Sequence, residues 1–275
     1  MFYISLIVIL IFFFVGVYLG KISFKQSPDI NLSNTHIKSK LFSYSIVLLG
    51  IIFGCLVVLL KNDNLLELMP LGFQRFSTLY AWSVFASIIT LSSGFIITIA
   101  IKTRYPKQKY IPSLILLNLM FFILFFRINQ PIYDIVSTNS YKNGGVLQST
   151  NYSCTSASVA TISYMYGKKV TEKEVAKLSN LSKFGATSGE LRYTLNKLGF
   201  RYKTIVDTKQ KLKTLTPLAI IYIDYPNLGK ESHTVVYLGY KDGIYHIWDP
   251  LKGYRDIPQK QMDSIWHGNG IEVYR

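Results

Sequence analysis

The sequence predicts a two-part fold: an N-terminal α-helical membrane bundle of four transmembrane helices, then a soluble α+β domain with an antiparallel sheet. The 275 residues are 49% hydrophobic, which is too apolar for one ordinary soluble domain. Residues 1–140 carry 11 Lys and Arg and 4 Asp and Glu, clustered between apolar runs. Residues 141–275 carry 19 and 11, spread throughout. In this second half, helical patterns are followed by strand patterns, as in α+β domains.

Residues 1–127 are predicted to form the membrane domain. About 20 apolar residues span a bilayer as a helix. Four uncharged runs have about this length, at residues 2–20, 41–60, 79–101 and 110–126. A signal peptide is the rival interpretation of the first run, but this run lacks a basic start and a small-residue cleavage site.

The basic residues predict how the chain is oriented in the membrane. Residues 21–40 and 102–110 together hold eight Lys and Arg, whereas residues 61–78 hold two, offset by two acidic residues. Because cations concentrate in cytoplasmic loops, the two basic loops are predicted to be cytoplasmic. We therefore expect a multi-pass protein of a bacterial cytoplasmic membrane, with the C-terminal domain on the extracytoplasmic side.

The net charge of +15 does not indicate a nucleic-acid partner. In the first half the cations flank apolar runs, where orientation in the bilayer explains them. In the second half they alternate with acidic and hydrophobic residues and form no long basic block.

Residues 128–143 are predicted to be a linker, because Pro131 and several Asn and Ser residues interrupt any regular pattern. Gly144 and Gly145, where the predicted domain of residues 144–275 begins, are interpreted as a flexible continuation of this linker. Self-cleavage after this Gly-Gly pair is the alternative, but the pair lies too close in sequence to the candidate site to reach it easily.

The soluble domain is predicted to begin with helices. One starts at Cys154 and stops at Gly167, since glycine suits a helix C-terminus. Thr171 and Glu174 form a capping-box pattern for a second helix, and a third follows Thr187 and ends at Gly199. Strands are then predicted at residues 200–206, 217–223, 233–240, 244–248 and 271–274.

Cys154 is the candidate nucleophile. The only other cysteine, Cys55, lies in an apolar run, so a disulfide between the two is not expected. The N-terminal end of a helix carries positive partial charge that favours a thiolate. A catalytic thiol also needs a base and a group that orients the base.

His233 is the candidate base, because it opens the strand pattern HTVVYLGY. Asp249 ends the following strand pattern, and the Asp242-Gly243 turn between the two strands predicts a hairpin that brings Asp249 close to His233. His246 and His267 are interpreted as structural.

Gln148 is the candidate oxyanion donor, six residues before Cys154. A side-chain amide there would act together with a backbone N–H at the nucleophile. Asn151 is the second choice.

These residues together resemble the C39 family of cysteine peptidases, the bacteriocin-leader peptidases, over residues 144–275. The resemblance rests on Gln148 six positions before Cys154, the YMYG sequence that ends the helix, and Asp249-Pro250 sixteen residues after His233. It implies a papain-like fold in which Cys154 is the nucleophile, His233 the general base and acid, Asp249 the orienting group and Gln148 part of the oxyanion hole. No cofactor and no metal are implied.

The resemblance also implies a thiol protease that cuts peptide bonds after Gly-Gly. We therefore expect a membrane-anchored cysteine endopeptidase acting on exported or membrane-bound precursor peptides or proteins. The family often has Asp-Cys-Gly where this sequence has Ser153-Cys154-Thr155. Well-known members are fused to ABC exporters, but this sequence has no P-loop pattern and resembles the stand-alone, membrane-tethered members.

Two alternatives remain open from the sequence. The domain could be a catalytically silent module that binds a peptide without cutting it, a reading prompted by Thr155. It could also transfer the acyl group to an acceptor other than water, as transglutaminase-like relatives of the papain fold do.

Overall fold

The structure is a computed structural model, and it describes residues 2–25, 38–61, 63–102, 111–138, 144–206, 209–215, 217–226 and 229–275. The chain forms two compact units. The first comprises residues 1–61 and 77–130, and the second comprises residues 62–76 and 131–275. The second unit therefore includes a short segment from between two apolar helices, which the sequence did not predict.

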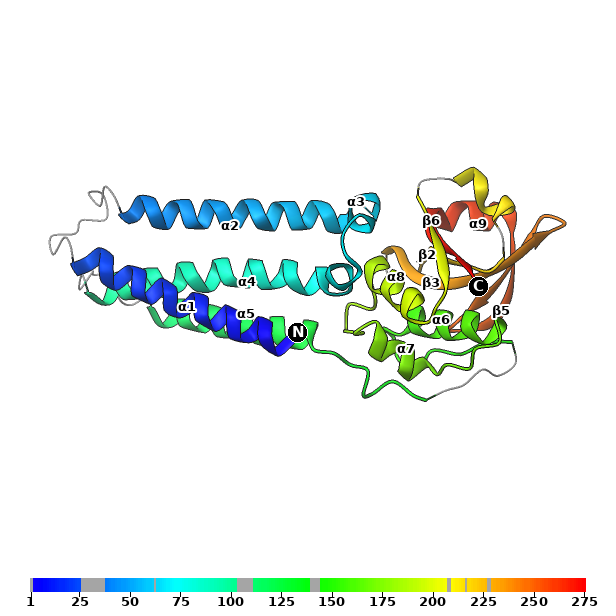
Figure 1. The fold of residues 1–275 in the computed structure, drawn as a ribbon, viewed down its shortest axis with the longest axis horizontal. Coiled ribbons are helices and arrows are strands. Elements are labelled where there is room, and N and C mark those ends of the chain that lie inside the picture. The colour runs from blue at the N-terminus through cyan, green and yellow to red at the C-terminus, as the bar shows by residue number, and fades with distance from the viewer. Residues whose placement is uncertain are drawn as a thin grey trace. The chain divides into compact units, whose positions relative to one another are not determined.

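Long helices cover each of the four predicted apolar runs (Figure 1). They are α1 (Phe2–Lys25), α2 (Lys38–Lys61), α4 (Leu71–Lys102) and α5 (Ile111–Asn129). Among the described residues, the stretches long and apolar enough to cross a bilayer are Tyr3–Ile22 and Leu79–Ile99. The apolar stretches of the other two helices are shorter, at Leu48–Leu59 and Ile111–Arg127. The prediction of four membrane helices is thus supported for two candidate spans.

Much of both predicted basic loops and part of the predicted linker lie outside the described residues, at 26–37, 103–110 and 139–143. The orientation of the chain in the membrane therefore stays a prediction from the sequence.

Glycines bring the two candidate spans, α1 and α4, into close contact. A Cβ atom added at Gly20 would lie 2.8 Å from Thr98 Cβ. One added at Gly16 or Gly94 would overlap the backbone of the other helix. Small residues four positions apart, such as Gly16 and Gly20, allow this kind of approach between helices in a membrane.

The second unit contains, among its described residues, a six-stranded sheet in the order β1-β6-β2-β3-β4-β5. Every neighbouring pair is antiparallel, as predicted. The strands are β1 (Arg201–Ile205), β2 (Ala219–Tyr225), β3 (Gly229–Lys241), β4 (Ile244–Asp249), β5 (Gly253–Pro258) and β6 (Trp266–Tyr274). The sequence did not predict β5 or the helix α9 (Gln259–Ile265) that follows it.

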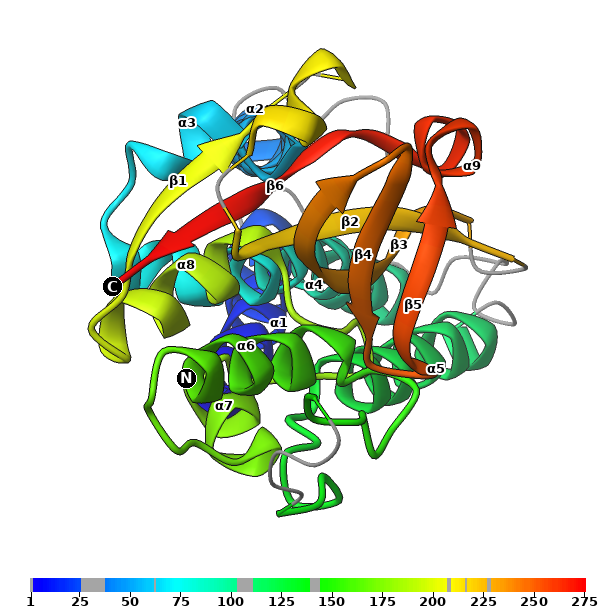
Figure 2. The ribbon, with the colours of Figure 1, turned by 90° about the vertical axis from the view of Figure 1, so that its right-hand side faces the viewer.

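Helices lie on both faces of this sheet (Figure 2). On one face, α6 (Cys154–Met165) and α8 (Ser188–Lys197) share a core with Ile220 of β2. On the other face, α9 packs near Ile221 of the same strand. The alternation of β2 side chains between the two cores follows from the two-residue period of a strand.

The described part of the second unit also contains two short helices. They are α3 (Asp63–Glu67) and α7 (Glu172–Leu178), and a short 3₁₀ helix spans Lys209–Thr214. The predicted capping box of α7 is confirmed, because Thr171 N donates to Glu174 Oε2 at 2.8 Å and Glu174 N donates to Thr171 Oγ1 at 3.2 Å. Gly167, just past α6, has a φ of 78°, a conformation that glycine adopts without strain.

The Gly144-Gly145 pair packs inside the second unit, so its interpretation as a flexible linker is wrong. A Cβ atom at Gly145 would overlap the indole ring of Trp248, whose Nε1 donates a hydrogen bond to Val146 O at 3.0 Å. The absence of a side chain at Gly145 lets Trp248 lie directly on the backbone. Because Trp248 covers this peptide, self-cleavage after the pair is also disfavoured.

Candidate active site

Cys154 is the first residue of α6, which packs against β3. The rest of the first turns of this helix is buried, whereas Cys154 is partly exposed and lines a cleft. The sulfur therefore lies at the positive end of a helix and remains open to a ligand.

The hairpin of β3 and β4 brings His233 and Asp249 together, as the sequence predicted. Lys241 pairs with Ile244 across the Asp242-Gly243 turn, and a register shift between Tyr237 and Gly239 moves the pairing by one residue farther along the hairpin. His233 Nε2 lies 2.8 Å from Asp249 Oδ1, and both side chains are almost fully buried. The Leu251 N–H donates to the same carboxylate at 2.9 Å, so Asp249 is held from two sides.

His233 lines the same cleft as Cys154, and each of the two groups shifts the pKa of the other. Because Nε2 faces Asp249, Nδ1 is the ring nitrogen that remains for the sulfur. A second contact links the same two elements: the hydroxyl groups of Thr155 and Thr234 lie 3.0 Å apart, and both side chains are buried. Thr155, which stands where Gly often follows the nucleophile in the C39 family, therefore connects α6 to the strand that carries His233.

Cys154, His233 and Asp249 shift one another's pKa: the values of the thiol and the carboxyl are lowered, and that of the imidazole is raised. Burial opposes ionisation of the Cys154 thiol, but the hydrogen bond and positive charge of His233, helped by Thr234, outweigh it and lower the pKa. Burial opposes protonation of His233, but Asp249 and Cys154 raise its pKa to about 9. For Asp249, burial is outweighed by His233, Leu251 and Arg255, so its pKa is lowered. A thiolate beside an imidazolium is the favoured state.

Gln148 and Asn151 both line the cleft with Cys154. The backbone N–H of Gln148 donates to Pro250 O at 2.9 Å, and its Nε2 donates to Thr150 O at 2.7 Å. An amide nitrogen has two hydrogens, so one N–H of Gln148 is not used by this bond. This anchoring holds the Gln148 amide at the cleft, with one donor available to a ligand.

His246 and His267 do not line this cleft. His246 Nδ1 lies 2.6 Å from Asp256 Oδ1, and His267 Nε2 lies 2.8 Å from Asp224 Oδ2. Each of the two therefore has its own carboxylate partner, consistent with the structural role expected from the sequence.

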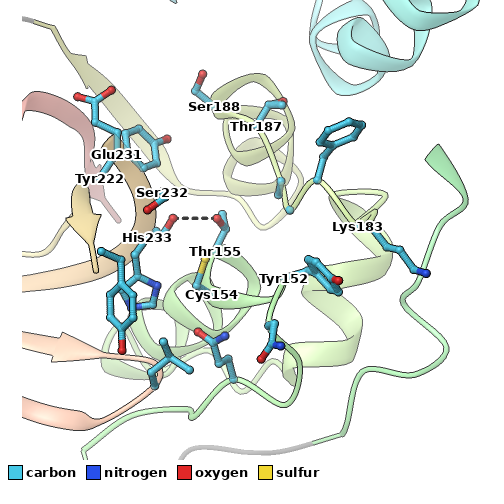
Figure 3. A pocket seen from close by; sticks show the side chains of 18 of the residues that line it. Tyr152, Cys154, Thr155, Lys183, Thr187, Ser188, Tyr222, Glu231, Ser232 and His233 are labelled. Carbon is cyan, nitrogen blue, oxygen red and sulfur yellow. Dashed lines mark hydrogen bonds between the residues drawn. The ribbon is translucent and has the colours of Figure 1, made fainter. Parts of the chain in front are cut away.

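The cleft has a volume of about 940 Å³. Figure 3 looks into it and shows Cys154 beside His233, with Thr187 and Ser188 on the helix beyond them. Tyr222 and Tyr225 line the sheet side, and the rings of Tyr225 and His233 have centroids 4.9 Å apart. The sequence does not indicate that these residues line the site, because no local pattern shows which residues face Cys154.

Comparisons with known proteins each cover about half of the chain. A sequence model of the peptidase C39 family matches residues 142–275. An uncharacterized protein of Methanothermobacter thermautotrophicus is 27% identical over 141 residues, which are 51% of this chain and 95% of that protein. The colicin V secretion/processing ATP-binding protein CvaB of Escherichia coli is 27% identical over 127 residues, 46% of this chain but 17% of that protein.

Two solved structures are also similar. One is a double glycine motif protease from an AMS/PCAT transporter in complex with the leader peptide, with 24% identity, a TM-score of 0.44, and coverage of 50% of this chain and 99% of that one. The other is the peptidase domain of Streptococcus ComA, a bi-functional ABC transporter involved in a quorum sensing pathway. It has 22% identity and a TM-score of 0.43, and the match covers 50% of this chain and 98% of that one. On the family match, the C-terminal part of the chain, residues 142–275, belongs to the peptidase C39 family.

Proposed function

We propose that the chain is a membrane-anchored cysteine endopeptidase that processes exported or membrane-bound precursor peptides after a Gly-Gly pair. The observation that carries this proposal is the placement of Cys154 beside His233 in one cleft, with His233 Nε2 2.8 Å from the buried carboxylate of Asp249. Membership in the peptidase C39 family supports the same class of reaction.

In the first step, the Cys154 thiolate attacks the carbonyl carbon of the peptide bond, and the carbonyl oxygen becomes an oxyanion. The backbone N–H of Cys154 and the second N–H of Gln148 Nε2 stabilise this charge. As the C–N bond breaks, the His233 imidazolium gives its proton to the leaving amine. The product is a thioester of Cys154 and a neutral His233.

In the second step, neutral His233 takes a proton from a water molecule, whose oxygen attacks the thioester carbonyl. The C–S bond breaks, the acid product leaves, and the thiolate and imidazolium are restored. Asp249 stabilises the imidazolium and fixes its ring orientation throughout.

A preference for glycine has a steric basis in this cleft. The ring of Tyr225 packs beside His233, and Tyr222 lines the same wall. Bulky groups beside the base leave little room next to the reacting carbonyl, and such a site rejects residues with larger side chains.

The candidate spans in α1 and α4 would anchor this site at a membrane. An anchored enzyme meets a membrane-bound substrate at a high effective concentration. The charge distribution of the loops favours the extracytoplasmic side for the site.

The experiment that tests this function uses the full chain in membranes and a precursor peptide with one Gly-Gly pair. Mass spectrometry is expected to show a single cut after the second glycine. Replacing that glycine in the substrate by valine is expected to lower kcat/KM about 10²-fold, because the added side chain meets the cleft wall. Equal cutting of both substrates, or cuts elsewhere, would contradict the Gly-Gly assignment.

The activity is expected to depend on pH as a bell-shaped curve. As pH rises, kcat/KM increases while the Cys154 thiol ionises, and because its pKa is lowered this limb lies below the ordinary thiol range. At higher pH, kcat/KM falls as His233 loses its proton around its pKa of about 9. Asp249→Asn removes a charge that stabilises the imidazolium, so the alkaline limb is expected to move to lower pH. An alkaline limb that stays in place in this variant would disagree with the assignment.

A further inference from the structure

The segment of residues 63–76 lies in sequence between the apolar helix α2 and the candidate span Leu79–Ile99, but it belongs to the second unit. It consists of α3 and the first turns of α4, and α3 contacts α8. Leu66 is 1% exposed, whereas Leu68, two residues later, is 80% exposed. The segment therefore has one face packed in the unit and one face in solvent.

The first contact with α8 is a buried hydrogen bond. Arg192 Nε donates to Gln74 Oε1 at 2.7 Å, and the two residues are 0% and 2% exposed. Gln74 Nε2 donates to Met69 O at 2.7 Å within the segment. Gln74 thus links the two ends of the segment through Met69 and accepts a hydrogen bond from the buried guanidinium of Arg192. A guanidinium group is costly to bury without such partners.

The second contact is made by Arg75. Its guanidinium lies 4.6 Å from the centre of the Tyr193 ring, a cation–π geometry. It also donates to Tyr193 Oη at 3.3 Å and, at the end of α7, to Lys177 O at 3.0 Å.

The third contact is a close approach of backbones at the first turn of α8. A Cβ atom added at Gly189 would lie 2.7 Å from Gln74 O. The neighbouring residues of this turn, Thr187 and Ser188, line the cleft together with Cys154 (Figure 3). The first turn of α8 therefore lies between the segment and the substrate cleft.

We propose that residues 63–76 are a built-in positioning element of the peptidase, which fixes the first turn of α8 and with it one wall of the cleft. This inference rests on the proposed function for its effect on catalysis. The segment and the peptidase domain are one folded unit, so they lie on the same side of the membrane. If α1, α2, α4 and α5 all cross the bilayer, this is the side opposite the two basic loops.

The catalytic effect is tested with Gly189→Ala and Gln74→Leu in the full chain. Both are expected to raise KM for a Gly-Gly peptide about tenfold, the size expected from losing a buried hydrogen bond to a charged group. The kcat is expected to change less than about twofold, because no described contact joins the segment to Cys154, His233 or Asp249. Gln74→Glu keeps an acceptor for Arg192 but loses the donor to Met69 O, so it is expected to restore KM in part.

Asn196→Ala, at an exposed position of the same helix, is the matched control and is expected to leave KM unchanged. A fall in kcat with unchanged KM in Gly189→Ala and Gln74→Leu would overturn the positioning role. Wild-type values of KM and kcat in both Gly189→Ala and Gln74→Leu would overturn it as well.

The docking of the segment is tested without any activity, so that its failure and the failure of the proposed function are distinguishable. Leu66→Cys and Leu68→Cys are made separately in a Cys55→Ser, Cys154→Ala background, and intact cells are treated with a membrane-impermeant maleimide. The cysteine at position 68 is expected to react, and the one at position 66 to be protected until denaturant is added or Gly189→Ala is introduced. Equal labelling of both would overturn the docking, and labelling of position 68 only after permeabilisation would overturn the extracytoplasmic placement.

Discussion

Cys154→Ala is expected to abolish cleavage of a Gly-Gly precursor while the protein accumulates at its normal level. Loss of the nucleophile in comparable hydrolases lowers kcat by about 10⁴–10⁶-fold. The substitution removes one sulfur at a cleft wall and leaves the buried Thr155–Thr234 contact in place, so little loss of stability is expected. The measurement is the ratio of mature to precursor peptide in cells and with purified full chain.

Cys55→Ser is the matched control, because Cys55 lies exposed in α2 outside the candidate site. It is expected to process the precursor at the wild-type rate. Processing of the precursor by Cys154→Ala at the wild-type rate would contradict the proposed mechanism.

A thiol probe separates the enzyme from a silent peptide-binding module. In the proposed enzyme, alkylation of Cys154 at neutral pH is fast and slows in His233→Ala, because the imidazolium stabilises the thiolate. A thiol that stays inert in the wild type, in a chain that still binds the precursor, would favour the silent module. Intact-product mass would reveal transfer of the acyl group to an acceptor other than water.

Gln148→Ala is expected to lower kcat by about 10²–10³-fold with little change in KM, the cost of removing one oxyanion donor. The reason is that the amide meets full negative charge only in the transition state. The backbone hydrogen bond from Gln148 N to Pro250 O remains, so the loop keeps its anchor. Steady-state kinetics with one Gly-Gly peptide provide both constants.

Asn151→Ala is the comparison variant, since Asn151 lines the same cleft. If Gln148 is the donor, the kcat of Asn151→Ala is expected to stay within about threefold of wild type. This change is much smaller than the fall of about 10²–10³-fold expected when an oxyanion donor is removed. A larger fall in kcat for Asn151→Ala than for Gln148→Ala would assign the oxyanion donor to Asn151 instead.

Much of the site could be predicted from the sequence because its signals are local. The start of α6 at Cys154 and the stop at Gly167 depend on neighbouring residues only. The approach of His233 to Asp249 depends on one hairpin, in which the tight turn pairs Lys241 with Ile244 and a register shift between Tyr237 and Gly239 then moves the pairing by one residue. The turn could be predicted from the sequence, whereas the register shift was not. At the end of this hairpin, His233 Nε2 and Asp249 Oδ1 lie 2.8 Å apart.

Other features could not be predicted because they depend on contacts between distant parts of the chain. β5 carries few of the β-branched and aromatic residues typical of strands, and its pairing with β4 makes it a strand. Gly145 reads as a linker residue until Trp248, about a hundred positions later, packs on it. Of the four predicted membrane helices, two contain stretches long and apolar enough among the described residues to cross a bilayer, and the crossings of α2 and α5 stay predictions.

The sequence by itself determined the class of the C-terminal domain and the chemistry available to it, because a cysteine at a helix start and a His–Asp hairpin are encoded within short stretches. The tertiary structure alone decided which residues surround that chemistry. Thr187 and Ser188 face the cleft, and residues 63–76 join the domain, through contacts such as Gln74 with Arg192, 118 positions apart. Contacts over such separations depend on how whole elements pack, and no local pattern in the sequence specifies them.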